Sequence, residues 1–194
     1  PAVALGAGII LWCLIFYLLP RPVRAYVLAH ELTHALWGAL GGARVSGLRV
    51  AARGGSVRLS TVNWVSTLAP YFFPLYTFLI VLAYYLLALL VDLRRRELLW
   101  FGLLGLSLGF HWTFTIEALS RPQSDIRRYG KLFAYPLIYL LNLLGLALLL
   151  LLVAPVTPAL LVTWLRQDTI WALRGCFLGL SGLWQWLALS RLAA

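Results

Sequence analysis

Apolar runs of about twenty residues are the feature that most constrains how this chain can fold. The clearest of them occupy residues 3–19, 65–92, 98–119 and 132–153. Each is long enough to cross the hydrocarbon core of a bilayer as a helix. Hydrophobic residues make up 62% of the chain and charged residues only 11%, and a soluble domain could not hide that much apolar surface from water. The sequence therefore predicts an integral membrane protein.

The breaks between the runs predict an all-α polytopic membrane protein with about six transmembrane helices. A less apolar helix is expected over residues 23–40, between Pro20-Arg21-Pro22 and Gly41-Gly42, because proline interrupts helices and glycine often ends them. The long run at 65–92 is interrupted early by Pro70 and Pro74, and a polar loop is expected over residues 120–130.

The C-terminal spans, at about 155–192, are interrupted by Arg166-Gln167-Asp168. The total therefore stays open between five and seven spans. Because no linker or internal repeat divides the sequence, we expect a single membrane domain over residues 1–194, with a catalytic core at about 22–153.

Residues 43–61 differ from the rest of the chain because polar and apolar side chains alternate along them. Ser56-Val57-Arg58-Leu59-Ser60 alternates cleanly, residues 43–50 do so less regularly, and Gly54-Gly55 lies between the two segments. Alternation is typical of strands and a glycine pair of a tight turn. We predict a small β-hairpin at the membrane surface, directly after the helix at 23–40; an irregular basic loop is the alternative.

The net charge of +10 comes mostly from arginines in the breaks between apolar runs. A nucleic-acid-binding protein would gather its cations on one soluble face, so no nucleic-acid partner is expected, and the cations are assigned to topology and lipid headgroups. Counting across alternate breaks puts Arg21, Arg24 and residues 94–96 on one side. The larger group, at residues 44–58 and 121–131, lies on the other side, which the positive-inside rule favours as cytoplasmic.

The motif that carries chemistry is His30-Glu31-Leu32-Thr33-His34, a complete H-E-x-x-H. On a helix, residues four apart share a face, so both imidazoles can bind one metal ion. Zinc lowers the pKa of a bound water to about 7, and a neighbouring carboxylate can accept its proton. The motif predicts one Zn²⁺ per chain on His30 and His34, with Glu31 as the catalytic base. The alternative is a polar patch that faces a water-filled cavity or other helices.

The segment from Ala29 to Ala35, followed by Gly41-Gly42 and an alternating basic stretch, resembles the site-2 protease family of intramembrane zinc metalloproteases. The resemblance covers roughly residues 22–150. Thr33 stands where the family usually has glycine. Leu68-Ala69-Pro70-Tyr71 occupies the place of a later Gly-Pro element and lacks its glycine and the following asparagine.

A third zinc ligand is implied by the resemblance, because the family supplies an aspartate, usually within Leu-Asp-Gly, near the start of a later span. That tripeptide is missing here, and the nearest counterpart is Asp125 in Gln123-Ser124-Asp125-Ile126. Two alternatives precede it, His111 and Glu117, either as ligands or as groups that orient a ligand, hold water or bind substrate backbone. Asn142 has the same ambiguity, with interhelical hydrogen bonding as its default. Asp125 itself could instead pair with Arg127 or Arg128.

These features together predict an intramembrane zinc metalloprotease. Its substrate would be a membrane protein with a single span, cleaved within or near that span after an edge strand within residues 43–61 has paired with it. A regulatory partner protein is possible, since we find no soluble module. The arginine-rich, lysine-poor composition indicates a GC-rich bacterial genome and hence the bacterial inner (cytoplasmic) membrane.

Two other functions remain open on the sequence. One is a metal-binding membrane protein without protease activity, such as a scaffold, chaperone or transporter subunit. The other is a zinc hydrolase acting on a lipid or a small amide, which H-E-x-x-H alone does not exclude.

Overall fold

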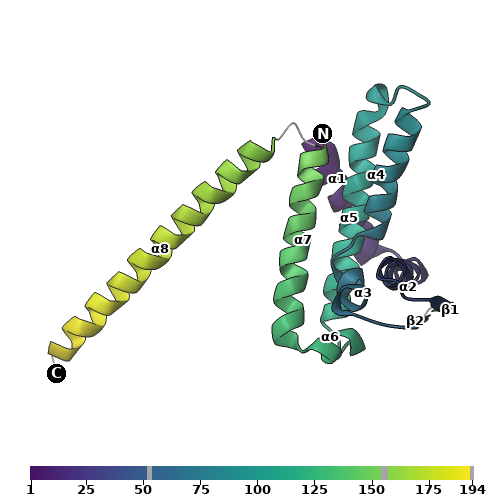
Figure 1. The fold of residues 1–194 in the computed structure, drawn as a ribbon. Helices are drawn as coiled ribbons and strands as arrows, with labels where there is room; N and C mark the ends of the chain where they lie inside the picture. Colours follow the sequence, from purple (N-terminus) through teal and green to yellow (C-terminus); the bar gives the residue numbers. More distant parts are fainter. Residues whose placement is uncertain (52–53, 154–156, 193–194) are drawn as a thin grey trace. The chain divides into compact units, whose positions relative to one another are not determined.

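A computed structural model describes residues 1–51, 54–153 and 157–192 (Figure 1). The chain is 76% helix and carries a small two-stranded antiparallel sheet, as the sequence predicted. It divides into two compact units, Pro1–Leu146 and Ala147–Ala194. Since the boundary falls inside a helix, Lys131–Val153, the expectation of one membrane domain stays a prediction.

The first unit contains most of the secondary structure. In chain order its elements are α1 (Ala2–Leu18), α2 (Val23–Leu40), β1 (Val45–Ala51), β2 (Gly54–Leu59), α3 (Trp64–Leu68), the 3-10 turn η1 (Ala69–Tyr71), α4 (Leu75–Ala88), the 3-10 turn η2 (Arg94–Arg96), α5 (Glu97–Leu119), α6 (Ser124–Tyr129) and the larger part of α7 (Lys131–Val153). The expected polar loop at 120–130 is thus largely the short helix α6.

The second unit holds the end of α7 and one long helix, α8 (Pro158–Leu192). The expected interruption at Arg166-Gln167-Asp168 is wrong, because α8 continues through these residues. Arginine and glutamine are good helix formers, so a polar triplet ends an apolar run without ending the helix. The expected break just after the run at 132–153 falls on residues 154–156, which lie outside the described residues.

Fewer helices than six qualify as membrane spans in the described part of the chain. Two are long and apolar enough, Glu97–Leu119 and Lys131–Leu149, and up to four qualify if two bent helix pairs each count as one span. These pairs are α1 with α2, bent by 119°, and Trp64–Tyr71 with α4, bent by 83°. The prediction of six spans counted the runs before and after Pro20-Arg21-Pro22 as two separate spans, whereas the chain bends by 119° between these two short helices.

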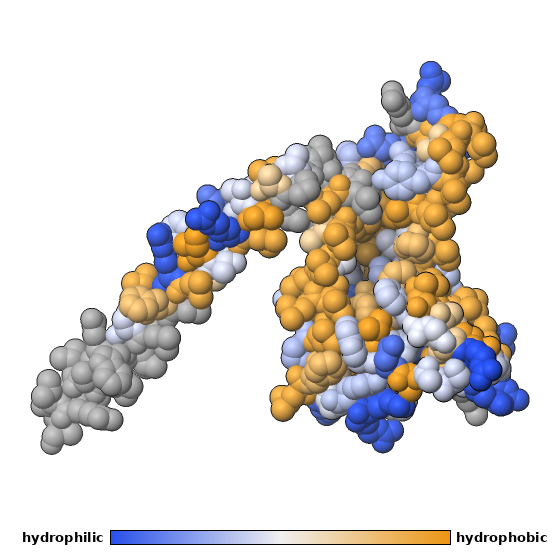
Figure 2. Space-filling view, viewed as in Figure 1, coloured by the Kyte–Doolittle hydropathy of each residue, from blue (hydrophilic) through white to orange (hydrophobic). Residues whose placement is uncertain are grey.

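The helices of the first unit expose large apolar side chains over their lengths (Figure 2). Examples, all at least 40% exposed, are Leu11, Leu14, Phe78, Leu82, Leu86, Leu140 and Leu144. Hydrophilic residues gather instead at the ends of the unit, among them the end where α6 and the hairpin lie (Figure 2). A surface of this kind is stable against lipid and unfavourable in water.

The first and fifth helices run side by side and approach closely through small residues. A Cβ on Gly8 would collide with the backbone of Gly102, and one on Gly105 with the backbone of Leu5. Further along the interface, Trp12 donates a hydrogen bond to the Thr113 hydroxyl at 2.8 Å. Such small-residue contacts let helix backbones approach in membranes. The contacts advance together along both helices, from Ala4 beside Gly102 to Trp12 beside Gly109 and Thr113, so α1 and α5 are parallel.

This packing corrects the predicted distribution of charges. Arg21 follows α1 and donates to Glu117 at 3.1 Å, and Arg121 at the end of α5 donates to the same carboxylate at 2.7 Å. Arg21 therefore lies at the same end of the unit as Arg121, not opposite it as the sequence count assumed. The count treated α2 as a span that crosses the membrane, but the 119° bend turns α2 across the end of α5.

The β-hairpin is confirmed and lies over α2. Its strands pair from Val45 opposite Leu59 to Ala51 opposite Gly54, with an irregularity between Ser46 and Arg49. The predicted glycine turn was wrong, because Gly54 and Gly55 belong to β2; residues 52–53 lie outside the described residues. Gly55 has another use: a Cβ there would come within 2.6 Å of Glu31 Cγ and 2.7 Å of Val27 Cγ1.

Candidate metal centre

The two motif histidines point into the same space from consecutive turns of α2. Their Nε2 atoms lie 3.2 Å apart, and their rings meet edge to face at 80° with centroids 4.8 Å apart. Helical periodicity alone accounts for this pairing, because residues i and i+4 share a face.

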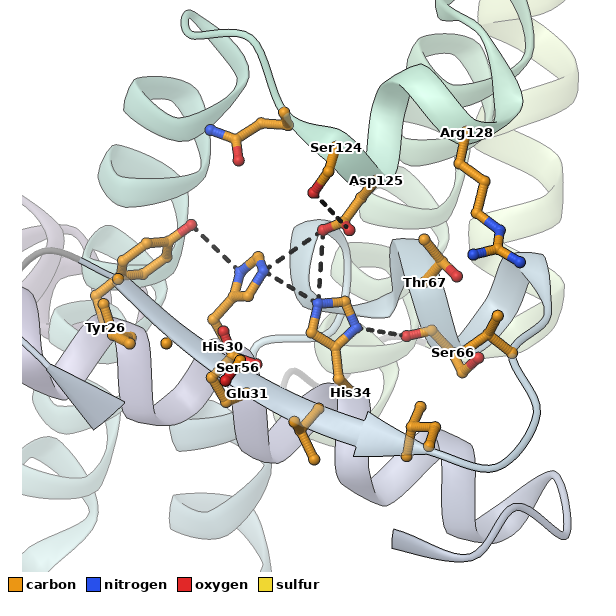
Figure 3. Close-up of a pocket in the computed structure, with 17 residues that line it drawn as sticks. Tyr26, His30, Glu31, His34, Ser56, Ser66, Thr67, Ser124, Asp125 and Arg128 are labelled. Carbon is orange, nitrogen blue, oxygen red and sulfur yellow. Dashed lines mark hydrogen bonds and ion pairs between the residues drawn. The ribbon is translucent and has the colours of Figure 1, made fainter. Parts of the chain in front are cut away.

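Asp125 joins them from α6, 91 residues after His34 in the chain. Its Oδ2 lies 3.7 Å from His30 Nε2 and 3.5 Å from His34 Nε2 (Figure 3). One ligand atom from each of the three residues lies within 4.8 Å of the others, so the group could hold a metal ion. The sequence offered three candidates for the third ligand: Asp125, His111 and Glu117. The structure places Asp125 in this group.

The position of Asp125 follows from the packing of α6. Ile126, the next residue, is 3% exposed and belongs to an apolar cluster with Leu68, Tyr71, Ala134 and Ile138. Burial of Ile126 anchors α6 against α3, η1 and α7. The carboxylate one residue earlier is thereby directed towards α2.

The Nδ1 atoms of both histidines, which are not the ring nitrogens nearest Asp125, have partners that orient the rings. His34 Nδ1 lies 2.7 Å from the backbone carbonyl of Ser66; since a carbonyl only accepts, Nδ1 carries the proton and Nε2 keeps a lone pair for a metal. His30 Nδ1 lies 3.4 Å from the Tyr26 hydroxyl. The donor set is therefore two imidazoles and a carboxylate, a combination typical of zinc sites that keep one position open.

Asp125 is held by a residue that the sequence analysis did not assign to the site. Tyr71 is fully buried and donates a hydrogen bond of 3.0 Å to Asp125 Oδ2. Asn142 donates in turn to the backbone carbonyl of Tyr71 at 2.9 Å. The signal for Tyr71 was in the sequence, because Leu68-Ala69-Pro70-Tyr71 was already aligned with the second element of the family it resembles.

The electrostatics of the site keep Asp125 ionised. Burial alone would raise the pKa of this carboxyl, but the neighbouring imidazoles of His30 and His34 and the hydrogen bond from Tyr71 hold the pKa of Asp125 well below its usual range. A permanently negative oxygen opposite two imidazoles is the charge arrangement that a divalent cation requires.

Glu31 lies beside the metal group, at the base of a cleft of about 580 Å³. It is 7% exposed, and β2 passes directly over it at Gly55. His30, His34 and Asp125 line the same cleft. The carboxylate thus lies next to the space where a metal-bound water and a substrate carbonyl would meet.

One wall of the cleft is the edge of β2. Gly54, Gly55, Ser56 and Val57 line it consecutively, as does Leu59. Neighbouring side chains of a strand point to opposite faces, so consecutive lining residues mean that the strand presents its edge to the cleft. Among the described residues the sheet has two strands, so β1 pairs with one edge of β2 and no strand pairs with the other edge.

The other residues proposed from the sequence lie outside the metal group. Glu117 binds Arg21 and Arg121. His111 lies on α5 behind His30, where both border a cavity of about 20 Å³, enough for one water molecule. In the described part of the chain, His111 Nε2 has no hydrogen-bond partner.

Asn142 does not line the cleft. Its amide donates to the carbonyl of Ile138 in its own helix at 2.9 Å, and its bond to the Tyr71 carbonyl links α7 to η1. Only the second bond fits the default expectation of hydrogen bonding between elements, and it reaches the metal group through Tyr71.

Comparison with known proteins yields no match: no family model, curated protein or solved structure is significantly similar to this chain. The assignment of function therefore depends on the geometry of the site.

Proposed function

We propose that this chain is an intramembrane zinc metalloprotease, which cleaves a peptide bond within or near the span of a membrane-protein substrate. One observation carries the proposal: His30, His34 and Asp125 converge next to Glu31, at the base of a cleft bordered by the free edge of β2. The resemblance of the motif region to the site-2 protease family supports the same function.

Zinc is the metal that this donor set favours, because imidazole and carboxylate ligands with one open position are typical of catalytic zinc. Bound there, zinc would polarise a peptide carbonyl and make water a stronger nucleophile. His30, His34 and Asp125 would hold the ion, while Ser66, Tyr26 and Tyr71 keep the ligands in place.

Glu31 supplies the proton transfers in this proposal. Its carboxylate takes a proton from the attacking water and then delivers it to the amide nitrogen that leaves. Its low exposure limits competing hydration, and its place next to His30 in the chain keeps it near both reacting groups.

The edge of β2 would solve the main difficulty of cleaving a membrane helix. A helical peptide bond has its carbonyl hydrogen-bonded within the helix. An extended segment that pairs with β2 gives up those bonds for new ones to the strand, and presents its backbone to the site. The proposed substrate is therefore a span that unwinds easily near the polar end of the first unit.

The first test is proteolysis by the purified full chain in detergent. Labelled casein would serve as a general substrate, and a tagged single-span protein in proteoliposomes as a membrane substrate. We expect zinc-dependent cleavage of the membrane substrate, reduced about 100-fold or more in Glu31→Gln with zinc still bound.

The outcomes separate the alternatives. Cleavage that survives in Glu31→Gln would refute the role of that residue. Zinc binding without cleavage of either substrate would favour a metal-binding scaffold, chaperone or transporter subunit. Hydrolysis confined to lipids or small amides would favour a zinc hydrolase that acts on those compounds.

A further inference from the structure

The part of the cleft formed by α6 and α3 carries a cation and a hydroxyl for which the described residues provide no partner. Arg128 on α6 and Thr67 on α3 both line the cleft, and Figure 3 shows them on the side of His34 away from Tyr26. Among the described residues, neither side chain has a hydrogen bond, and Arg128 has no ion pair. Both groups are donors that can face a ligand in the cleft.

In the described part of the chain, neither of the two acids that line the cleft, Glu31 and Asp125, forms an ion pair with Arg128. Asp125 precedes it by three residues in the same helix, yet the Asp125 carboxylate is directed to His30 and His34. Glu117 is held by Arg21 and Arg121. The alternative that Asp125 is a surface carboxylate paired with Arg127 or Arg128 is therefore not what the described contacts show.

We propose that Arg128, with Thr67, binds a carboxylate of the extended substrate segment and so selects acidic peptides. This inference rests on the proposed function, since it concerns the occupant of the same cleft. A guanidinium binds a carboxylate through two parallel hydrogen bonds, and a hydroxyl beside it can add a third. The carboxylate belongs to an Asp or Glu side chain of the substrate or to its C-terminus.

The position of Arg128 favours a peptide over a lipid headgroup. It shares one cleft with the metal ligands and the free edge of β2, where an extended backbone would lie. The neighbouring Arg127 is also exposed but does not line the cleft. It therefore provides a matched control for the general positive field at this end of the protein.

The test reverses the charge at position 128 of the protein and at one position of the peptide, and measures binding. Fluorescent peptides, identical except for one Glu, Gln or Lys scanned along the sequence, would be bound to the full-length Glu31→Gln protein with zinc. At one position we expect the Glu peptide to bind at least about tenfold more tightly than the Gln peptide. Arg128→Glu should reverse the preference towards Lys, whereas Arg127→Glu should leave it unchanged.

Weaker binding after amidation of the C-terminus, with that dependence lost in Arg128→Glu, would support the inference and identify the terminal carboxylate as the ligand. Equal binding of the three peptides at every position, together with no effect of amidation, would overturn the inference. An equal loss of preference in Arg127→Glu would also overturn it, because it would indicate a general positive field that attracts anionic lipid as well. Cleavage by the unaltered protein is measured separately with the same peptides. If none is cleaved while binding depends on Arg128, the proposed function fails and the carboxylate site stands.

Discussion

The α1–α5 interface and the metal centre are held together in opposite ways. Between α1 and α5, glycines allow the backbones to approach, and aromatic rings such as Trp12 and Phe110 fill the remaining space at a centroid distance of 4.9 Å. Around α2 and α6, directed hydrogen bonds fix individual polar side chains. The first interface depends on shape, the second on the direction of a few donors and acceptors.

The difference has a consequence for function. A change at the α1–α5 interface should reduce the stability of the whole unit, because a close backbone contact cannot relax locally. A change at the metal centre should alter metal affinity while leaving the helices folded, since the site lies at one end of the unit. The predictions below test whether the two regions separate in this way.

The largest effect is expected from removing a ligand. His34→Ala and Asp125→Ala should each lower zinc affinity by about 1,000-fold or more, because a site with two protein ligands binds zinc weakly. Zinc content by mass spectrometry and a competition titration would measure this. Retention of the helical circular dichroism signal would show that the two regions separate; its loss would contradict the comparison.

Gly105→Ala should produce the largest change in stability. The added methyl group would meet the backbone of Leu5, and overpacking of this kind costs about 3 kcal/mol. Thermal unfolding in detergent would measure the loss. Gly6→Ala is the matched control, because nothing lies within 4 Å of a Cβ at that position; an equal loss there would contradict the explanation.

Tyr71→Phe should weaken zinc binding by about 10- to 100-fold, the usual effect of removing a group that orients a ligand. The hydroxyl donates to Asp125 at 3.0 Å, while the buried ring stays in place. Competition with a chelator gives the affinity. An unchanged affinity would mean that the packing of Ile126 alone positions the carboxylate.

Gly55→Ala should lower proteolysis about tenfold and leave zinc content unchanged. A methyl group would press against Glu31 and Val27, so β2 would move away from α2 and from the Glu31 carboxylate. The loss corresponds to about 1.4 kcal/mol at the transition state. Loss of zinc together with activity would indicate that β2 supports the ligands themselves.

The smallest effect is expected for Glu117→Gln. Its two arginine pairs are partly exposed, so their removal should cost at most about 1 kcal/mol of stability and leave zinc bound. Thermal unfolding and metal analysis would measure both. Zinc lost in this variant would restore Glu117 as a ligand and overturn the assignment of Asp125.

Much of the site was predictable because it is local. His30, Glu31 and His34 lie within one helix, and helical periodicity alone brings the histidines together. The hairpin was also predictable, since alternation over residues 56–60 reflects a strand directly. The glycine turn was predicted wrongly because Gly55 is needed where β2 approaches α2 closely. In a sequence, a glycine required for tertiary packing looks the same as a glycine required for a turn.

The predictions that failed concerned how segments far apart in the chain are arranged relative to one another. The number of spans was overestimated because hydropathy gives the length of an apolar run but not the direction of the chain after a proline. The same error put Arg21 on the wrong side from Arg121, although both bind Glu117.

The sequence by itself determined that this protein has membrane-type helices and a pair of histidines on one helical face, because both follow from composition and periodicity within short segments. The tertiary structure decided that Asp125, not Glu117, joins that pair, and that Ser66 and Tyr71 orient the ligands. These contacts join residues far apart in the chain. Their geometry depends on the burial of Ile126 and on the bend before α2, which no local pattern encodes.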